Sequence, residues 1–207
     1  MSISRRQILR HGITGMAAVG YGGVAAPALS GAALPKPPVL GNPLAPKRLV
    51  VWGSYTCPFT AQLFNVVSDI LRDMPDAASV EWRHFATHAP DPALHVAGMG
   101  FAGDHFWGFT FKVLGAVLAA QGDHAVLTSA RLLDFAKAEG GSEETLKAAY
   151  ADKAKWTAVR QDMLAGQLLG VVRTPGLFYN GYFMTPEGLP VNTASFDKSL
   201  RAMLKAG

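Results

Sequence analysis

A single cysteine, Cys57, is the feature that most restricts the chemistry of this 207-residue chain. One cysteine cannot form an internal disulfide, so a hydrophobic core rather than a cross-link must hold the fold together. Cys57 is therefore either a small buried apolar residue or a free, reactive thiol.

The sequence also lacks a clear metal-binding pattern. His84 and His88 are four residues apart, a spacing that suits zinc on a helix, but His84 lies in a predicted strand and prolines follow His88. His95 and His105 are scattered further along the chain. We predict no metal site and expect no cofactor, although His84 or His88 could approach Cys57.

Acidic residues are missing from the first 32 positions. Three of the 19 Lys and Arg residues lie there, so the remaining 16 nearly balance the 15 acidic residues. The chain after position 32 shows neither a basic face with interleaved aromatic residues nor a pair of carboxylates arranged for catalysis. We therefore predict no nucleic-acid partner and no acid–base catalysis by paired carboxylates.

The segment 1–32 is predicted to be an export signal. Arg5 and Arg6, followed by Gln-Ile-Leu, resemble the twin-arginine consensus, and a mildly apolar stretch rich in Gly and Ala comes next. A membrane anchor is the alternative, but the apolar run is short and glycine-rich for a membrane span. We expect a periplasmic protein with no stable membrane insertion after signal removal.

The remainder of the chain is predicted to form one α/β domain. Residues 33–47 contain five prolines and are predicted to be an extended linker. Residues 48–207 then follow, in a chain that is 49% hydrophobic and 16% charged, which allows one substantial core.

Cys57 lies where a predicted strand passes into a predicted helix. The run 48–53 is rich in Val, and apolar residues recur on one helical face from Leu63 to Met74. Pro58 suits the first helical position because it has no N–H to leave unpaired. The unpaired N–H groups of the first turn and the helix dipole favour a thiolate, so we predict a reactive thiol.

Beyond this helix, residues 80–85 alternate like a strand, which completes a right-handed βαβ unit. Residues 90–168 have helical character and are predicted to be an insert with an aromatic core made by Phe106, Trp107, Phe109 and Phe111. Asn180-Gly181 between aromatic runs predicts a type I′ hairpin. Asn192-Thr193 is predicted to cap a final helix.

Together these features resemble the thioredoxin superfamily, specifically the exported disulfide oxidoreductases of the DsbA type. The resemblance covers 48–205 and is carried by Cys57-Pro58-Phe59-Thr60 at a helix start and by Thr174-Pro175 ahead of the hairpin. It implies an α/β, thioredoxin-like fold with an inserted helical subdomain. It also implies that the partners are protein or peptide thiols and disulfides.

The resemblance further implies which residues form the site. Cys57 would be the attacking thiol, within a catalytic motif completed by Pro58 and Thr60. A cis bond before Pro175 would lie beside Cys57, and the main chain of Thr174 could then pair with an extended substrate.

Two side chains are predicted to border the substrate-binding region. Phe59 follows the first two residues of the motif, and Arg173 immediately precedes Thr174. Arg173 either faces the thiolate or is a solvated loop residue.

The motif departs from its family at Thr60, where the second cysteine of Cys-x-x-Cys is expected. That second thiol normally resolves the mixed disulfide. Cys57 can still attack a disulfide, but an outside thiol must finish the exchange, and glutathione is a candidate co-substrate. The Thr60 hydroxyl could donate a hydrogen bond to the Cys57 sulfur.

Three functions follow from this pattern. The first is a monothiol thiol–disulfide oxidoreductase that forms mixed disulfides through Cys57. The second is a redox-inactive module that binds peptides or a partner beside Pro175. The third is a single-cysteine peroxidase or thiol sensor, although the proline that peroxiredoxins carry upstream is replaced by valines here.

Overall fold

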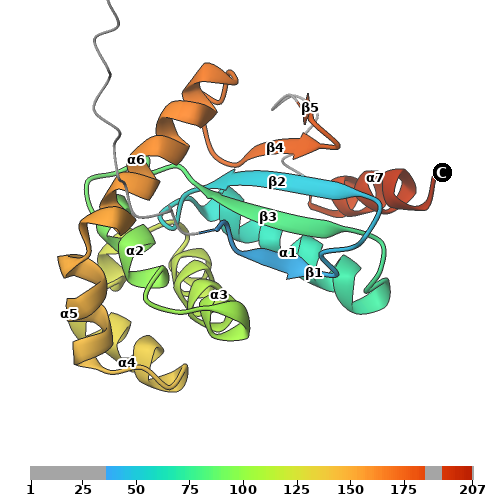
Figure 1. Cartoon of the computed structure of the whole chain (residues 1–207). Coiled ribbons are helices and arrows are strands. Elements are labelled where there is room, and N and C mark those ends of the chain that lie inside the picture. The colour runs from blue at the N-terminus through green and yellow to red at the C-terminus, as the bar shows by residue number, and fades with distance from the viewer. Residues whose placement is uncertain (1–35, 185–192, 207) are drawn as a thin grey trace, which may run out of the picture. The chain divides into compact units, whose positions relative to one another are not determined.

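The computed structural model of the protein describes residues 36–184 and 193–206. Within them the chain forms a five-stranded sheet of order β1-β3-β2-β4-β5 (Figure 1). The strands are β1 (Val39–Gly41), β2 (Arg48–Gly53), β3 (Ser79–His84), β4 (Gly176–Tyr179) and β5 (Tyr182–Met184). Only β2 and β3 pair in parallel, as the predicted βαβ unit requires, and the other pairs are antiparallel.

Helices connect and cover these strands. They are α1 (Pro58–Asp73), α2 (Asp91–Gly98), α3 (Gly103–Ala119), the short 3₁₀ helix η1 (His124–Val126), α4 (Ser129–Ala138), α5 (Glu143–Ala151), α6 (Lys153–Leu168) and α7 (Thr193–Lys205). No helix among the described residues is long and apolar enough to cross a membrane. The predicted signal 1–32 and the predicted cap residue Asn192 lie outside the described residues.

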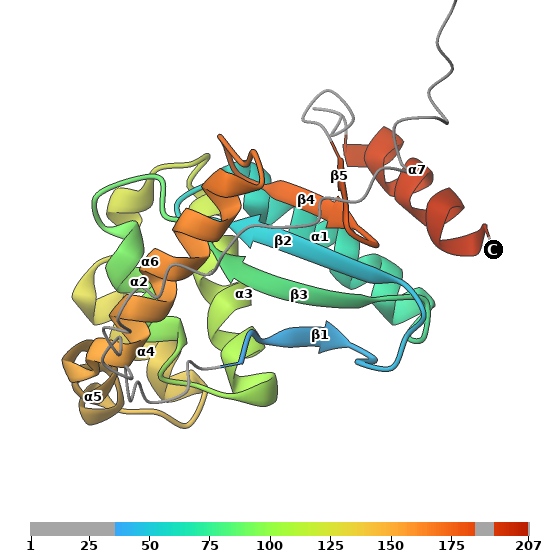
Figure 2. The same cartoon turned by 45° about the horizontal axis from the view of Figure 1, so that its top comes forward.

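Alternation along β2 divides the core into two parts. Leu49 and Val51 point to one face and join a buried cluster that includes apolar residues of α1, α3 and α7. Trp52 points to the other face and packs with Phe85 and Phe178 in a second cluster. Its indole N–H donates to the carbonyl of Asp162 in α6 at 3.0 Å. The sheet is therefore covered by α1 on one face and by α6 on the other (Figure 2).

The predicted helical insert, α2 to α6, shares a core with the sheet. Phe106, Trp107 and Phe109 of α3 are buried as predicted, and the Trp107 ring lies 5.7 Å from that of Phe64 in α1. The Trp107 indole also donates to the carbonyl of Val39 in β1 at 3.0 Å. The insert therefore packs directly on the sheet domain instead of forming a separate unit.

Part of the predicted linker 33–47 is a strand. Val39–Gly41 pairs antiparallel with β3 at the edge of the sheet. An edge strand needs hydrogen bonds on one side only, so prolines at 37, 38 and 43 can flank it without breaking a ladder. The proline content correctly excluded a central strand but concealed this short edge strand.

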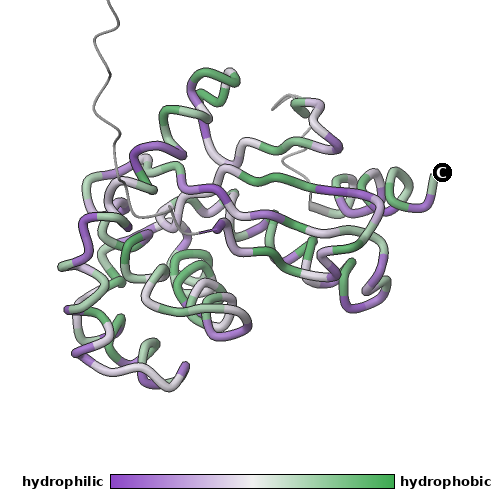
Figure 3. Tube along the Cα trace, viewed as in Figure 1, coloured by the Kyte–Doolittle hydropathy of each residue, from purple (hydrophilic) through white to green (hydrophobic). Residues whose placement is uncertain are grey.

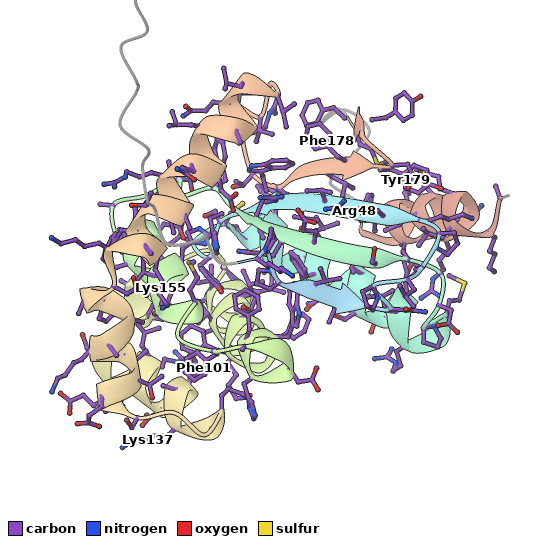
Figure 4. The ribbon with its side chains drawn as sticks, viewed as in Figure 1. Arg48, Phe101, Lys137, Lys155, Phe178 and Tyr179 are labelled. Atoms are coloured by element: carbon purple, nitrogen blue, oxygen red, sulfur yellow. The ribbon has the colours of Figure 1, made fainter. Side chains whose placement is uncertain are left out.

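The predicted hairpin at Asn180-Gly181 is confirmed. Both residues have positive φ, 47° and 87°, as a type I′ turn requires. Arg48 donates its backbone N–H to the Asn180 side chain, and Asn180 donates its own to the Arg48 carbonyl, both at 2.8 Å. Figure 4 shows Arg48 at the start of β2 beside Tyr179 of β4. The hairpin thereby fixes the register between β2 and β4.

Gly166 of α6 supports the contact with Trp52. A Cβ atom there would lie 2.6 Å from the Trp52 indole and 3.0 Å from Phe85. We expect Gly166→Ala to lower the free energy of unfolding by about 1–3 kcal/mol, because the indole or α6 must shift. Chemical denaturation measures this change.

Gly115→Ala is the matched control, because Gly115 is exposed in α3 and no atom would lie within 4 Å of its Cβ. We expect this variant to stabilise the protein by about 0.5–1 kcal/mol through the higher helix propensity of alanine. Equal effects of the two substitutions would contradict close packing of α6 on Trp52.

Candidate active site

Cys57 is placed by a tight turn between β2 and α1. The backbone N–H of Cys57 donates to the carbonyl of Ser54 at 3.3 Å, which closes the turn Ser54–Cys57. Cys57 is the N-cap residue of α1 and has an extended backbone. Its side chain is largely buried, with 8% of the residue exposed. The predicted passage from strand to helix at this cysteine is therefore confirmed.

The Cys57 sulfur contacts the loop before β4. Sγ donates a hydrogen bond to the carbonyl oxygen of Thr174 at 3.3 Å, across 117 residues of sequence. The peptide bond between Thr174 and Pro175 is cis, as the family resemblance implies. Pro175 is buried and Thr174 is half-buried. The two parts of the predicted site thus meet at the sulfur.

The first turn of α1 leaves backbone donors beside Cys57. Pro58 is its first residue and has no N–H, so the first N–H groups without a partner inside the helix belong to Phe59 and Thr60. These groups and the dipole of a 16-residue helix stabilise negative charge at the N-terminus. Gly122 packs on Pro58, because a Cβ at Gly122 would lie 3.2 Å from the proline Cγ.

Thr60 is fully buried and turned toward the strand. Its Oγ1 accepts the backbone N–H of Ser54 at 3.4 Å, and its methyl group would lie 3.0 Å from a Cβ at Gly53. Among the described residues, the Cys57 sulfur has its hydrogen bond with Thr174, not with Thr60. The Thr60 hydroxyl, which stands where the second cysteine is expected, therefore stabilises the turn before Cys57.

Apolar side chains are exposed beside this site. Phe59 is 53% exposed at the start of α1. The last turns of α6 and the loop from α6 to Thr174 expose Leu164, Leu168, Leu169 and Val172. Figure 3 shows this end of α6 as hydrophobic. Arg173 is exposed as well and has no hydrogen bond or ion pair with another described residue, which agrees with the solvated alternative.

Hydroxyl and imidazole groups line the other side of the turn. Ser54 Oγ lies 2.8 Å from the Thr87 hydroxyl, and Thr56 Oγ1 lies 2.8 Å from His88 Nδ1. The His88 ring stacks on His124 of η1, with 5.1 Å between ring centroids. His88 thus contacts the turn through Thr56, while its predicted approach to Cys57 stays a prediction. The stacking with His124 was not predicted.

Asp91, the first residue of α2, stabilises the turn through hydrogen bonds to its backbone. Its Oδ1 accepts the backbone N–H of Tyr55 and its Oδ2 that of Thr87, both at 2.9 Å. The residue is fully buried, and this burial raises the pKa of its carboxyl group above the ordinary value. Burial also raises the pKa of the Tyr55 hydroxyl, which hydrogen-bonds to Thr110 at 2.8 Å.

Two histidines continue this buried cluster away from the site. His84 Nδ1 and His95 Nδ1 are 3.0 Å apart, and burial lowers the pKa of each imidazole to about 3. His84 therefore faces the core rather than Cys57. No group of three or more potential metal ligands occurs among residues 36–184 and 193–206.

Sequence reasoning missed Asp91 and its neighbours because their pairing is tertiary. The spacing of Asp91, His95 and His84 has no motif, and an aspartate in the first turn of a helix is common for local reasons. The one available signal was the polar run Ser54-Tyr55-Thr56 directly before Cys57, which needs buried partners once β2 is buried.

Comparison with known proteins shows which family and which solved structures this chain is similar to. The Thioredoxin_4 family model, described as "Thioredoxin", matches residues 33–204. BdbD from Bacillus subtilis, in its oxidised form, superposes with a TM-score of 0.65 at 24% identity, covering 82% of this chain and 94% of BdbD. Wolbachia pipientis α-DsbA1 gives a TM-score of 0.66 at 17% identity, covering 83% of this chain and 92% of its own. At these identities the solved structures establish the fold alone.

One curated relative also matches. The Na(+)/H(+) antiporter NhaA 1 of Salinispora arenicola is 29% identical over 147 residues, a match that covers 69% of this chain. The chain spans about a fifth of the length of that relative. The family model, by contrast, covers most of the chain, including both Cys57 and the Thr174-Pro175 loop. The chain therefore belongs to the thioredoxin family, and its fold is similar to those of BdbD and α-DsbA1.

Proposed function

We propose that this protein is a monothiol thiol–disulfide oxidoreductase that uses Cys57 to form mixed disulfides with proteins, peptides or glutathione. The observation that carries the proposal is the position of the sulfur. It lies at the N-terminus of α1 and against the main chain of Thr174. The first feature stabilises a thiolate and the second offers backbone groups to a disulfide-bearing segment.

The chemistry has two exchange steps. The Cys57 thiol first loses its proton and its hydrogen bond to Thr174, and the thiolate attacks one sulfur of a substrate disulfide. A new disulfide forms to Cys57 while the second substrate sulfur leaves as a thiolate. A free thiol such as glutathione then attacks the mixed disulfide, takes over the substrate sulfur and releases Cys57 as thiolate. No net oxidation of Cys57 occurs.

The exposed apolar segment before Thr174 and the Phe59 ring suit a substrate with apolar side chains. An extended peptide that pairs with the Thr174 main chain would lie between these two surfaces. This arrangement favours unfolded or misbridged polypeptides, whose apolar residues are accessible, over folded proteins.

A binding module without redox function is the second candidate. The thiol is largely buried, and its S–H is occupied by a carbonyl that favours the protonated sulfur. In this function the surface beside Pro175 binds a peptide, and Cys57 contributes to that surface without reacting.

The proposed location is the periplasm, reached by the twin-arginine route and followed by removal of segment 1–32. The paired arginines at 5 and 6 and the absence of acidic residues before position 33 support it. A thiol–disulfide exchange protein is suited to such an oxidising compartment.

Trapping of a mixed disulfide tests the main proposal. We expect reduced protein to form an adduct with glutathione disulfide at Cys57 at least ten times faster than free cysteine does at pH 7, because the helix start stabilises the thiolate. Mass spectrometry of acid-quenched samples measures the rate. Cys57→Ser is the control and should give no adduct.

The outcome separates the three functions. Reaction no faster than that of free cysteine would exclude both redox functions and leave the binding module. Rapid consumption of hydrogen peroxide with a sulfenic acid at Cys57 would instead indicate the peroxidase or sensor.

Restoration of the second thiol is an independent test. We expect Thr60→Cys to form a reversible internal disulfide with Cys57 and to gain dithiol oxidase activity toward a reduced peptide, because position 60 is one turn beyond the N-cap. Thiol titration and an oxidation assay measure the change. Ala61→Cys is the matched control, with a buried cysteine one position further on that should remain reduced. A Thr60→Cys protein that forms no internal disulfide would contradict an active site of the thioredoxin type at this helix start.

A further inference from the structure

A buried chain of polar side chains runs from β3 to the turn that carries Cys57. The Trp82 indole nitrogen lies 3.1 Å from His84 Nδ1, and His84 Nδ1 lies 3.0 Å from His95 Nδ1. His95 Nε2 in turn lies 3.6 Å from Asp91 Oδ1. Asp91 then accepts the N–H of Tyr55 within the turn. The proposed exchange chemistry uses none of these four side chains directly.

The hydrogen-bond donors fix the proton positions in this chain. An indole nitrogen can only donate, so His84 Nδ1 accepts from Trp82 and carries no proton. The second group in contact with His84 Nδ1 must then be a donor as well. His95 therefore carries its proton on Nδ1.

This tautomer leaves His95 Nε2 with a lone pair that faces Asp91. Nε2 has no hydrogen-bond partner within the described part of the chain, and both side chains are 0% exposed. An ionised Asp91 would place a carboxylate oxygen against that lone pair in a dry interior, which is strongly unfavourable. One proton between the two atoms converts the contact into a favourable one.

We propose that Asp91 and His95 together retain one such proton at neutral pH, and that in this state Asp91 is a positioning residue for Cys57. Its two oxygens hold the N–H groups of Tyr55 and Thr87, and so fix the turn that ends at Cys57. Loss of the proton introduces a buried negative charge beside the unpaired Nε2 of His95, and so changes the electrostatic field at the turn that carries Cys57.

The groups around the pair support this assignment. Burial raises the pKa of Asp91, although hydrogen bonds to its carboxyl group partly offset this effect, and burial lowers the pKa of His95 to about 3. Ser54, Tyr55 and Thr56 of the turn hydrogen-bond to Asp91 without adding charge. His84 of β3, which contacts His95, is also neutral because burial lowers its pKa to about 3. Arg83, the nearby cation on β3, is already bound to Asp162 and Glu81.

The shared proton predicts a pH dependence of stability with a definite sign. Well above pH 6.5 the unfolded chain has an ionised Asp91 and a neutral His95, whereas the folded pair holds one proton more. Stability is therefore present at lower pH and is lost as the pH rises. The unfolding equilibrium constant should increase about tenfold per pH unit from this pair, until the folded pair loses its proton.

Asp91→Asn tests the proton count. An amide can donate to His95 Nε2 at every pH, so the variant should lack this tenfold slope when urea unfolding is followed from pH 6.5 to 8.5. His105→Gln, which removes an exposed imidazole, is the control and should retain the wild-type slope. Equal slopes for wild type and Asp91→Asn would overturn the proposal.

If Asp91→Asn does not fold, carbon-13 NMR of the Asp91 carboxyl group in the wild type replaces the unfolding test, because its chemical shift reports the protonation state. A protonated carboxyl at pH 6.5 is expected. An ionised carboxylate beside a neutral His95 at that pH would overturn the proposal.

The positioning role rests on the proposed function and has its own readout. The rate of adduct formation with glutathione disulfide should fall at least tenfold in Asp91→Ala at pH 7. The wild-type pH profile should also contain a break, at the pH where the pair loses its proton, that is absent from Asp91→Asn. Identical profiles for both would refute the role, whereas an unreactive wild-type Cys57 would refute the proposed function and leave the unfolding test decisive.

Discussion

The contact between Cys57 Sγ and the Thr174 carbonyl joins two segments that are 117 residues apart, and most of the fold serves to bring them together. Cys57 follows β2, and Thr174 precedes β4. These two strands pair antiparallel, so that Trp52 at the end of β2 lies opposite Gly176 at the start of β4. Any slip in this register would separate the sulfur from the loop, because a one-residue shift reverses every side chain.

The helical insert and the hairpin both stabilise the register between β2 and β4. The Asn180 hairpin binds Arg48 at the far end of β2, and Trp52 is held near the site by α6 through the Asp162 carbonyl. The insert is thus more than a lid on a separate thioredoxin domain. Its helix α3 completes the main core against α1, whose first turn carries Cys57.

Two constraints of opposite kind act on Cys57. The start of α1 favours a negative sulfur, whereas the Thr174 carbonyl accepts the thiol proton and favours a neutral one. A substrate that takes over the Thr174 main chain would remove the second constraint and leave the first. Thr60 supports the turn in place of a resolving cysteine. In the proposed function this replacement would limit the chemistry to single exchange steps that need an external thiol.

Much of this could be predicted from local patterns. Periodicity located α1 and β3, Asn180-Gly181 identified the hairpin, and Cys57-Pro58 marked the start of α1, because each depends on neighbours in sequence. The cis bond before Pro175 and its proximity to Cys57 came from family resemblance, and the structure contains both.

The sequence by itself determined that this chain has one thiol, at a helix start, with no second cysteine to resolve a mixed disulfide. Only the tertiary structure decided what surrounds that thiol. The pairing of Asp91 with the Tyr55 backbone, the His84–His95 contact and the edge strand β1 all join residues whose spacing has no periodic signal. Buried polar groups must find partners, but which partners they find depends on how strands and helices pack.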